Sequence, residues 1–120
     1  MKLTLKDRVL ILNTVLPQFD TRKNMELKIS IDRKIAISDS DQKRIVTQDI
    51  GNGQFNIGFT DSKAHTDEIN IEITNNELEY LKQRVNYLDS IGMFSEYTLP
   101  TYIKIIEEPF IESNDKSIEK

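Results

Sequence analysis

The sequence predicts a single α+β domain, built from two N-terminal helices, a three-stranded antiparallel β-meander and two C-terminal helices. Three observations lead to this class. Apolar residues recur at helical spacing near both ends of the chain, apolar and polar residues alternate in its middle, and 120 residues suit one domain. We expect the domain to span residues 1–109. Residues 111–120 are polar and unpatterned, and we expect a flexible C-terminal tail from residue 110 to residue 120.

A capping pattern and an apolar stripe predict the first helix. Thr4 followed by Asp7 resembles a capping box, so this helix should begin near Leu5 and end before Pro17. Its buried face would hold Leu5, Val9, Leu12 and Leu16.

The segment 21–36 fits two structures. From Met25 to Ile31, apolar and polar residues alternate as they do in a strand, whereas Leu27, Ile31 and Ile35 share one helical face. We favour a helix capped by Thr21 and keep the strand as the alternative. Residues 38–41 read Ser-Asp-Ser-Asp, which predicts a short helical turn through about residue 44.

The β signal lies in the middle of the chain. Residues 45–50 and 55–59 flank Gly51-Asn52-Gly53, and Asn-Gly supplies the positive-φ positions of a tight hairpin. Residues 61–64 are expected to form a loop. Ile69, Ile71 and Ile73 alternate with polar residues and predict the third strand.

Two helices should complete the domain. Thr74 and Glu77 form a capping box, and Gly92 is placed to end the helix that they open. Its buried stripe would be Leu78, Leu81, Val85 and Leu88. The last helix should begin at Ser95 or Thr98 and end at Pro109. We expect it to turn Leu99, Tyr102, Ile103 and Ile106 inward.

Composition excludes several classes of function. The chain has no Cys and one His, so a disulfide framework, a thiolate nucleophile and paired imidazoles are absent. A charged N-terminus and the lack of a long apolar run predict a cytoplasmic protein that does not act at a membrane. Residues 1–50 carry ten basic and seven acidic side chains, a net +3, and residues 51–120 carry six and thirteen, a net −7.

No group of residues assembles a convincing catalytic, cofactor or metal site. His65 lies near Asp61, Asp67 and Glu68, but one His among loop carboxylates is a weak metal site. Asp39 and Asp41 lack the Gly and distal Glu of a calcium loop. The carboxylates of Glu77, Glu79, Glu107 and Glu108 are expected on helix exteriors or ends. We therefore predict no catalytic residue, cofactor or metal.

Two clusters are candidate contact surfaces. Met93, Phe94 and Tyr97 follow Gly92, where they would either bind a protein or close the end of the core. A basic strip in the first half would suit phosphate groups. It comprises Arg22, Lys23, Lys28, Arg33 and Lys34, interrupted by Asp20, Glu26 and Asp32.

Three stretches carry a resemblance to known proteins. The segment 3–17 reads LTLKDRVLILNTVLP, residues 71–82 read IEITNNELEYLK, and residues 99–106 read LPTYIKII. Together they resemble short, uncharacterised phage and prophage proteins of bacteria. The resemblance implies a phage or prophage origin and a helix–hairpin–helix layout, and it brings no catalytic residues.

The predicted function is therefore non-enzymatic. We expect a phage-type accessory protein that binds another protein, either a virion component or a host factor, in the bacterial cytoplasm or on the virion. The alternative is a nucleic-acid-associated protein that uses the basic strip, although a net charge of −4 disfavours this partner. The sequence leaves the partner and the oligomeric state open.

Overall fold

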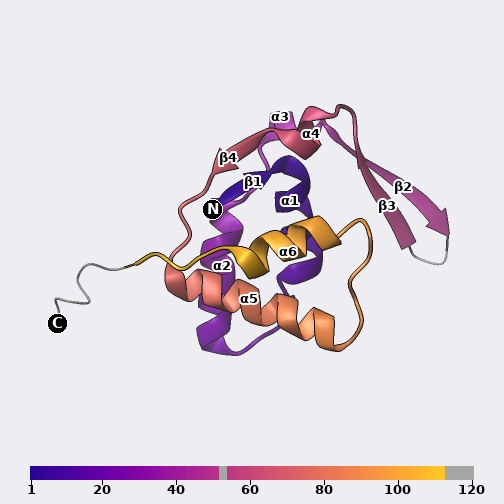
Figure 1. Cartoon of the computed structure of the whole chain (residues 1–120). Helices are drawn as coiled ribbons and strands as arrows, with labels where there is room; N and C mark the ends of the chain where they lie inside the picture. Colours follow the sequence, from indigo (N-terminus) through magenta and orange to yellow (C-terminus); the bar gives the residue numbers. More distant parts are fainter. Residues whose placement is uncertain (52–53, 113–120) are drawn as a thin grey trace, which may run out of the picture.

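The computed structural model describes residues 1–51 and 54–112 and shows a mixed α and β protein, as predicted. Figure 1 shows α5 and α6 lying side by side across the body, with the β2–β3 ribbon projecting from one side. The elements follow in the order β1 (Lys2–Thr4), α1 (Leu5–Leu10), the π-helical turn η1 (Ile11–Val15), α2 (Arg22–Lys34), α3 (Asp39–Gln42), β2 (Ile45–Gly51), β3 (Gln54–Phe59), α4 (Lys63–Thr66), β4 (Glu68–Asn70), α5 (Asn75–Ser90) and α6 (Leu99–Glu107).

The strands do not form the predicted meander. In the described part of the chain they make two antiparallel two-stranded sheets, β1 with β4 and β2 with β3. The hairpin was predicted correctly. The segment expected as a third strand pairs instead with the N-terminal residues, with Leu3 opposite Ile69. The segment 61–64, expected as a loop, leads into α4, which turns the chain away from the hairpin and toward β1.

The predicted first helix is interrupted in its second half. The Thr4–Asp7 capping box is confirmed, and α1 begins at Leu5. From Ile11 the turns widen, and the Leu16 amide donates to the Ile11 carbonyl five residues back. Thr14 donates its hydroxyl to the Leu10 carbonyl at 2.7 Å, a side-chain bond that competes with the backbone ladder. The result is a π-helical turn that periodicity alone does not reveal.

The segment 21–36 is a helix, so the strand alternative is wrong. The Thr21 hydroxyl accepts the Asn24 amide and caps α2, as predicted. Ile31 and Ile35 are fully buried, whereas Ile29 on the opposite face is 42% exposed. The helix therefore buries one face rather than two. Ser38 caps the short α3 by accepting the Asp41 amide.

The main core lies where η1, α2, α5 and α6 meet beneath the β1–β4 pair. Its most buried members come from these helices, from β1 and from the residue that follows α2. They are Leu3, Ile11, Val15, Ile31, Ile35, Leu81, Val85, Tyr102 and Ile105. A smaller cluster of Leu5, Val9 and Ala64 sits under the base of the hairpin, with Ile45, Ile57 and Phe59 packed against it.

Gly51 is the last residue of β2. Gly51 has φ +92°, a conformation that favours glycine, but the rest of the predicted Gly51-Asn52-Gly53 turn lies outside the described residues. At the C-terminal end, the backbone of Ile111 exchanges two hydrogen bonds with the Asn75 side chain, at 2.7 and 2.9 Å. The predicted tail beyond residue 112 also lies outside the described residues.

Two buried carboxylates connect the helices. Asp7 accepts hydrogen bonds from Thr101 and from Lys104 of α6. Glu77 caps α5 and accepts from Lys34 Nζ at 2.6 Å, so it is not the solvated carboxylate that the sequence suggested. Burial alone would raise the pKa of each group. The hydrogen bonds, chiefly from Lys104 to Asp7 and from Lys34 to Glu77, instead hold each pKa below its ordinary value.

These pKa values predict acid sensitivity. A carboxyl whose pKa is lower in the folded state stabilises the fold fully above the unfolded-state pKa of about 4, and this stability is lost as pH falls through the folded-state pKa. The free energy of unfolding in urea should therefore fall between pH 5 and pH 3, and it should fall less steeply in Glu77→Gln. Equal pH dependence in the two proteins would show that Glu77 is not coupled to folding.

Candidate functional site

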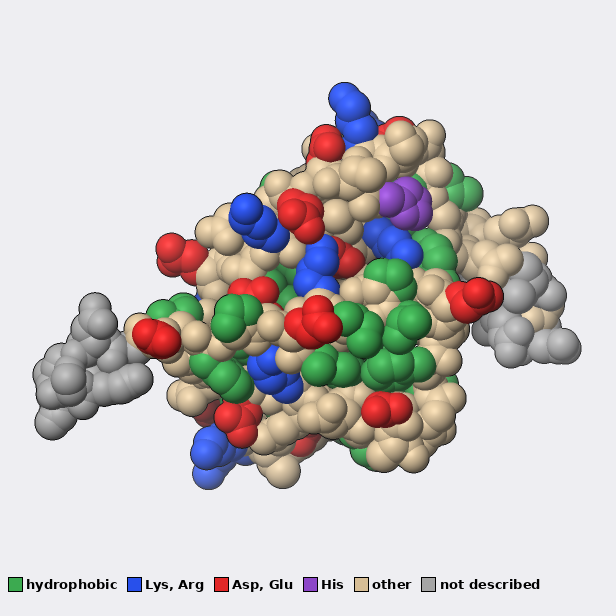
Figure 2. Space-filling model, viewed as in Figure 1, with side chains coloured by type: hydrophobic (Ala, Val, Ile, Leu, Met, Phe, Trp, Pro, Cys, Tyr) green, Lys and Arg blue, Asp and Glu red, His purple; other side chains and the backbone are tan. Residues whose placement is uncertain are grey.

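The outer face of α6 carries a row of exposed apolar side chains. Leu99, Ile103 and Ile106 are spaced four and three residues apart, so they form one stripe, and their side chains are 43%, 37% and 37% exposed. Figure 2 shows hydrophobic side chains gathered over this helix on the viewed face. We call Leu99, Ile103 and Ile106 the α6 stripe.

The orientation of α6 explains the stripe and corrects the sequence prediction. Only Tyr102 of the four residues expected to face inward is buried, because the helix is rotated to bury Thr101 and Ile105 as well. The Thr101 hydroxyl donates to Asp7 Oδ1 at 2.5 Å, and Lys104 Nζ binds Asp7 Oδ2 on the same side. A buried carboxylate needs such partners, so the bonds to Asp7 hold Thr101 and Lys104 toward α1, in the orientation that also buries Tyr102 and Ile105 and leaves the stripe outside.

The C-terminal end of α6 carries the apolar surface further along the molecule. Lys82 of α5 donates its ammonium to the carbonyls of Ile105 at 3.0 Å and Ile106 at 2.6 Å, which satisfies the helix end. The same ammonium lies 5.3 Å from the ring centre of Phe110. Phe110 is half-exposed and follows the stripe in sequence, so the exposed apolar surface runs beyond the helix.

Acidic side chains flank this surface. Glu96 precedes α6, Glu107 ends it and Glu112 follows Phe110, and all three are exposed. Figure 2 shows Asp and Glu side chains around the hydrophobic cluster. An apolar centre with a charged rim is the usual anatomy of a protein-binding surface.

The three residues predicted as a protein contact have separate surroundings. Met93 is 57% exposed, whereas the Phe94 ring packs against Tyr102 with 4.8 Å between ring centres. Phe94 therefore helps to close the core. Tyr97 lies beneath Lys6, whose ammonium is 4.2 Å from the ring centre, and its hydroxyl donates to the Ile57 carbonyl. Burial raises the pKa of Tyr97.

The predicted basic strip is divided on α2. Lys34 is paired with the buried Glu77, and Lys28 pairs with Asp32 at 3.2 Å. Arg22, Lys23 and Arg33 remain exposed. Binding of nucleic acid by this strip stays a prediction, but two of its five cations already have carboxylate partners.

Four of the residues weighed for metal binding, His65, Asp41, Asp61 and Glu68, make other contacts. The His65 ring meets Phe59 edge-on at 5.3 Å between ring centres. Across residues 1–51 and 54–112, no cluster of three or more His, Asp or Glu side chains is arranged to hold a metal ion.

We expect thermal unfolding to be independent of metal. The midpoint measured with a chelator should coincide with the midpoint measured without it, because packing and ion pairs hold the described fold together. A large fall in the midpoint on adding chelator would reveal a structural metal.

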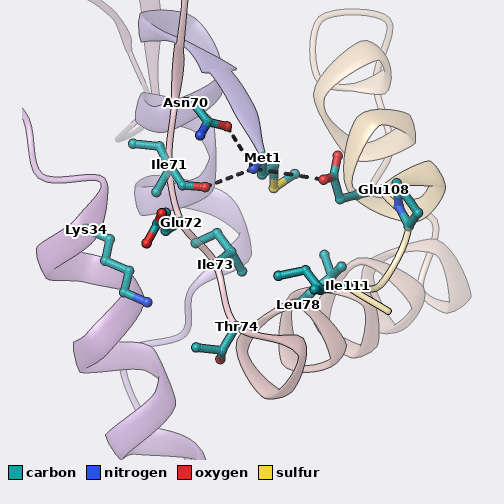
Figure 3. A pocket seen from close by; sticks show the side chains of 11 residues that line it. Met1, Lys34, Asn70, Ile71, Glu72, Ile73, Thr74, Leu78, Glu108 and Ile111 are labelled. Atoms are coloured by element: carbon teal, nitrogen blue, oxygen red, sulfur yellow. Dashed lines mark hydrogen bonds and ion pairs between the residues drawn. The ribbon is translucent and has the colours of Figure 1, made fainter. Parts of the chain in front are cut away.

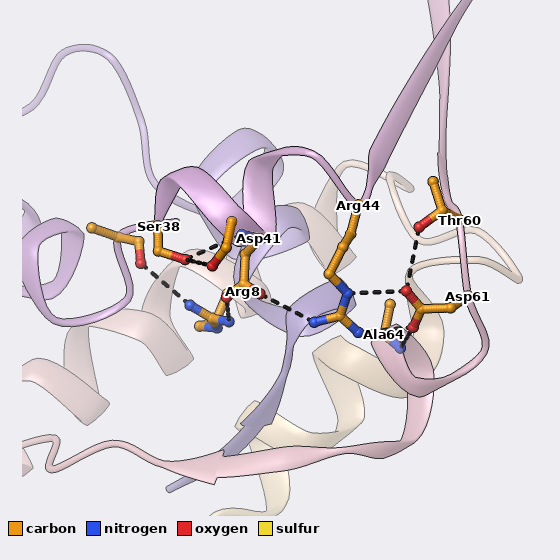
Figure 4. Close-up of polar contacts among 9 residues, drawn as sticks. Arg8, Ser38, Asp41, Arg44, Thr60, Asp61 and Ala64 are labelled. Atoms are coloured by element: carbon orange, nitrogen blue, oxygen red, sulfur yellow. Dashed lines mark hydrogen bonds and ion pairs between the residues drawn. The ribbon is translucent and has the colours of Figure 1, made fainter.

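Asp41 and Asp61 belong to a chain of four charged side chains (Figure 4). Arg8 donates to Asp41 at 3.0 Å, Arg44 donates to Asp41 at 3.1 Å, and Arg44 binds Asp61 through two nitrogens at 2.8 and 3.0 Å. Arg44 holds the pKa of Asp61 at about 2. The chain joins α1, α3, the start of β2 and the loop before α4, so it positions the base of the hairpin.

A cavity of about 450 Å³ lies between the N-terminus, the segment 70–74, the start of α5 and the segment 108–111 (Figure 3). Its wall includes Ile71, Ile73 and Leu78. The two cationic groups that line it already have partners, because the Met1 amino group donates to the Ile71 carbonyl at 2.8 Å and Lys34 binds the buried Glu77.

Comparison with protein-family models, curated proteins and solved structures finds no match for this chain. In the part of the chain that the structure describes, no helix combines the length and the apolar character needed to cross a membrane. The α6 stripe is thus the leading candidate site. Sequence reasoning assigned its residues to the core, although a helix that is apolar on nearly all sides already signalled an ambiguous face.

Proposed function

We propose that the protein acts by binding another protein through the α6 stripe. The observation that carries this proposal is the orientation of α6, which leaves three large apolar side chains partly exposed although the helix also buries Tyr102 and Ile105. Thr101 is fully buried, and the apolar Leu99, Ile103 and Ile106 face solvent. Such an arrangement adds little to stability, since burying apolar surface is what stabilises a fold. Contiguous exposed apolar surface with a polar rim marks an interaction site.

The chemistry of the surface supports one kind of partner. Three apolar side chains at positions i, i+4 and i+7 offer one ridge, which suits an amphipathic helix packed along α6. The rim formed by Glu96, Glu107 and Glu112 favours a partner with Lys or Arg beside its apolar face. Met93 and Tyr97, near the N-terminal end of α6, would extend the contact.

The biological setting follows from the sequence resemblance. We propose that the chain is a phage or prophage accessory protein whose partner is a virion component or a host factor. The genes that neighbour its own test this setting, because virion proteins and host-directed proteins occupy different blocks of a phage genome. Neighbours that are all chromosomal metabolic genes would argue against a phage origin.

The binding surface is tested by substitution at its centre. Ile103→Glu should lower affinity for a partner captured by the wild-type chain roughly thirty-fold or more, equivalent to about 2 kcal/mol, because it places a charge in the apolar centre. Titration calorimetry with the purified partner measures the change.

The matched control is Ile29→Glu, which alters an isoleucine of similar exposure on α2. This variant should bind as tightly as wild type. Both variants should keep the wild-type unfolding free energy within about 0.5 kcal/mol, as is typical of exposed sites. Equal affinities for Ile103→Glu and wild type would move the binding surface away from α6.

A further inference from the structure

The outer edge of β2 exposes backbone hydrogen-bonding groups. In an antiparallel pair, successive residues alternately face the partner strand and turn away from it. The Arg44 carbonyl accepts the Thr60 amide across the ladder at 2.9 Å, which fixes this alternation. Ile45, Thr47 and Asp49 consequently turn their N–H and C=O groups away from β3.

The two edges of the ribbon differ. On the β3 edge, the Ile57 carbonyl already accepts the Tyr97 hydroxyl at 2.9 Å, and this side faces the body of the molecule in Figure 1. β2 forms the outer side. Across the described residues, no backbone group of another segment hydrogen-bonds to the outward groups of Ile45, Thr47 or Asp49.

Between Ile45 and Asp49 this edge has little protection against strand pairing, because the β-bulge of β2 lies beyond that stretch, between Asp49 and Gly51. Natural edge strands carry Lys, Pro or a covering loop that prevents edge-to-edge association. The seven residues of β2 include one charged side chain, Asp49, and no Lys, Arg or Pro, in a chain that is 30% charged. A two-stranded ribbon is also marginally stable on its own, and added strands stabilise it.

We propose that β2 pairs antiparallel with β2 of a second copy of this chain, around a two-fold axis at Thr47. This register sets Thr47 against Thr47, Ile45 against Asp49 and Val46 against Gln48. The outward N–H and C=O groups of all three edge residues then find partners, and the two ribbons join in one four-stranded sheet. The surface is thus self-complementary, as a two-fold interface requires.

Charge favours this arrangement over other pairings. The two Asp49 carboxylates lie about 14 Å apart in the antiparallel dimer, four residues along the strand direction. A parallel, in-register pair would set them side by side and repel. The antiparallel pair instead brings Asp49 of one copy to the end of β2 where the exposed Lys43 of the other copy precedes the strand.

Substitution of Thr47 tests the pairing without breaking the hairpin. Thr47→Pro removes an outward N–H that β3 does not use, so the ribbon keeps its internal bonds. Sedimentation equilibrium at chain concentrations up to about 1 mM covers weak complexes. We expect the wild-type chain and Thr47→Ala to approach twice the monomer mass of 14.0 kDa, and Thr47→Pro to remain a monomer.

If Thr47→Pro does not fold, a cross-linking experiment tests whether β2 pairs with β2 of a second copy. The chain has no Cys, so Thr47→Cys introduces a single thiol at the proposed axis. Two such residues, directly opposite, lie within disulfide range. Oxidation should yield a disulfide dimer, whereas the exposed control Ser90→Cys should yield several-fold less.

Two results would overturn the proposal. One is a wild-type chain that stays monomeric across the concentration range, which would leave the β2 edge to a strand of a different protein. The other is cross-linking at position 47 that does not exceed cross-linking at position 90. Neither experiment depends on the α6 stripe, so the proposal stands or falls separately from the proposed function.

Discussion

Leu81→Ala should lower the free energy of unfolding by about 2–5 kcal/mol. Leu81 is 1% exposed on the inner face of α5 and belongs to the main core. Removing its isobutyl group loses buried apolar contact and leaves a cavity, because neighbours on several elements cannot all collapse into the space. Urea unfolding followed by circular dichroism measures the change.

The control for this substitution lies on the same helix. Asn86 is exposed on α5, and Asn86→Ala should change the free energy of unfolding by no more than about 0.5 kcal/mol. A loss for Leu81→Ala as small as that of the control would mean that α5 presents a different face to the core.

Asp7→Ala should cost about 2–4 kcal/mol of stability, less than the largest values for buried pairs because Lys104 can turn partly to solvent. The substitution removes the α1 capping box and leaves Thr101 without its carboxylate partner, while Lys104 keeps only its ion pair with Glu68. It acts on α1 and α6 together. Chemical unfolding at pH 7 gives the magnitude.

Asp67→Ala is the matched control, because Asp67 is an exposed acid at the C-terminal end of α4. It should leave stability nearly unchanged. Our account of α6 would be contradicted if Asp7→Ala were no more destabilising than this control, since Asp7 would then not orient the helix.

Local signals in the sequence predicted much of the helical structure. The capping boxes at Thr4 and Thr74 identify helix starts to the residue, because a cap satisfies backbone groups within one turn. The apolar stripe of α5 was predicted correctly, since one side of that helix is clearly polar. The pairing of β2 with β3 was equally local, because only two residues separate the two strands in the sequence.

The sequence did not predict the pairing of β1 with β4, which are far apart in the chain. β1 and β4 are three residues each and lie more than sixty positions apart, so neither carries a pattern long enough to identify its partner. Ile69, Ile71 and Ile73 show a genuine alternation, but α4 directs this segment away from the hairpin. A strand signal gives the conformation of a segment and not the sheet that it joins.

The sequence did not predict the candidate site, for a different reason. A helix that reads LPTYIKIIE is apolar on most of its circumference, so the hydrophobic pattern does not identify the buried side. The side of α6 that is buried depends on Asp7, which lies ninety-four positions before its hydrogen-bond partner Thr101. A buried carboxylate far away in sequence thus determines which isoleucines reach the surface.

Site-specific photo-crosslinking from α6 tests the central claim most directly. A photoreactive amino acid at position 103 should, in cells that naturally produce the protein, form one discrete adduct with another protein. The same group at position 29 should form none above background. Absence of an adduct at position 103, equal adducts at both positions, or an adduct of only twice the 14.0 kDa chain mass would contradict a heterologous partner on the α6 stripe.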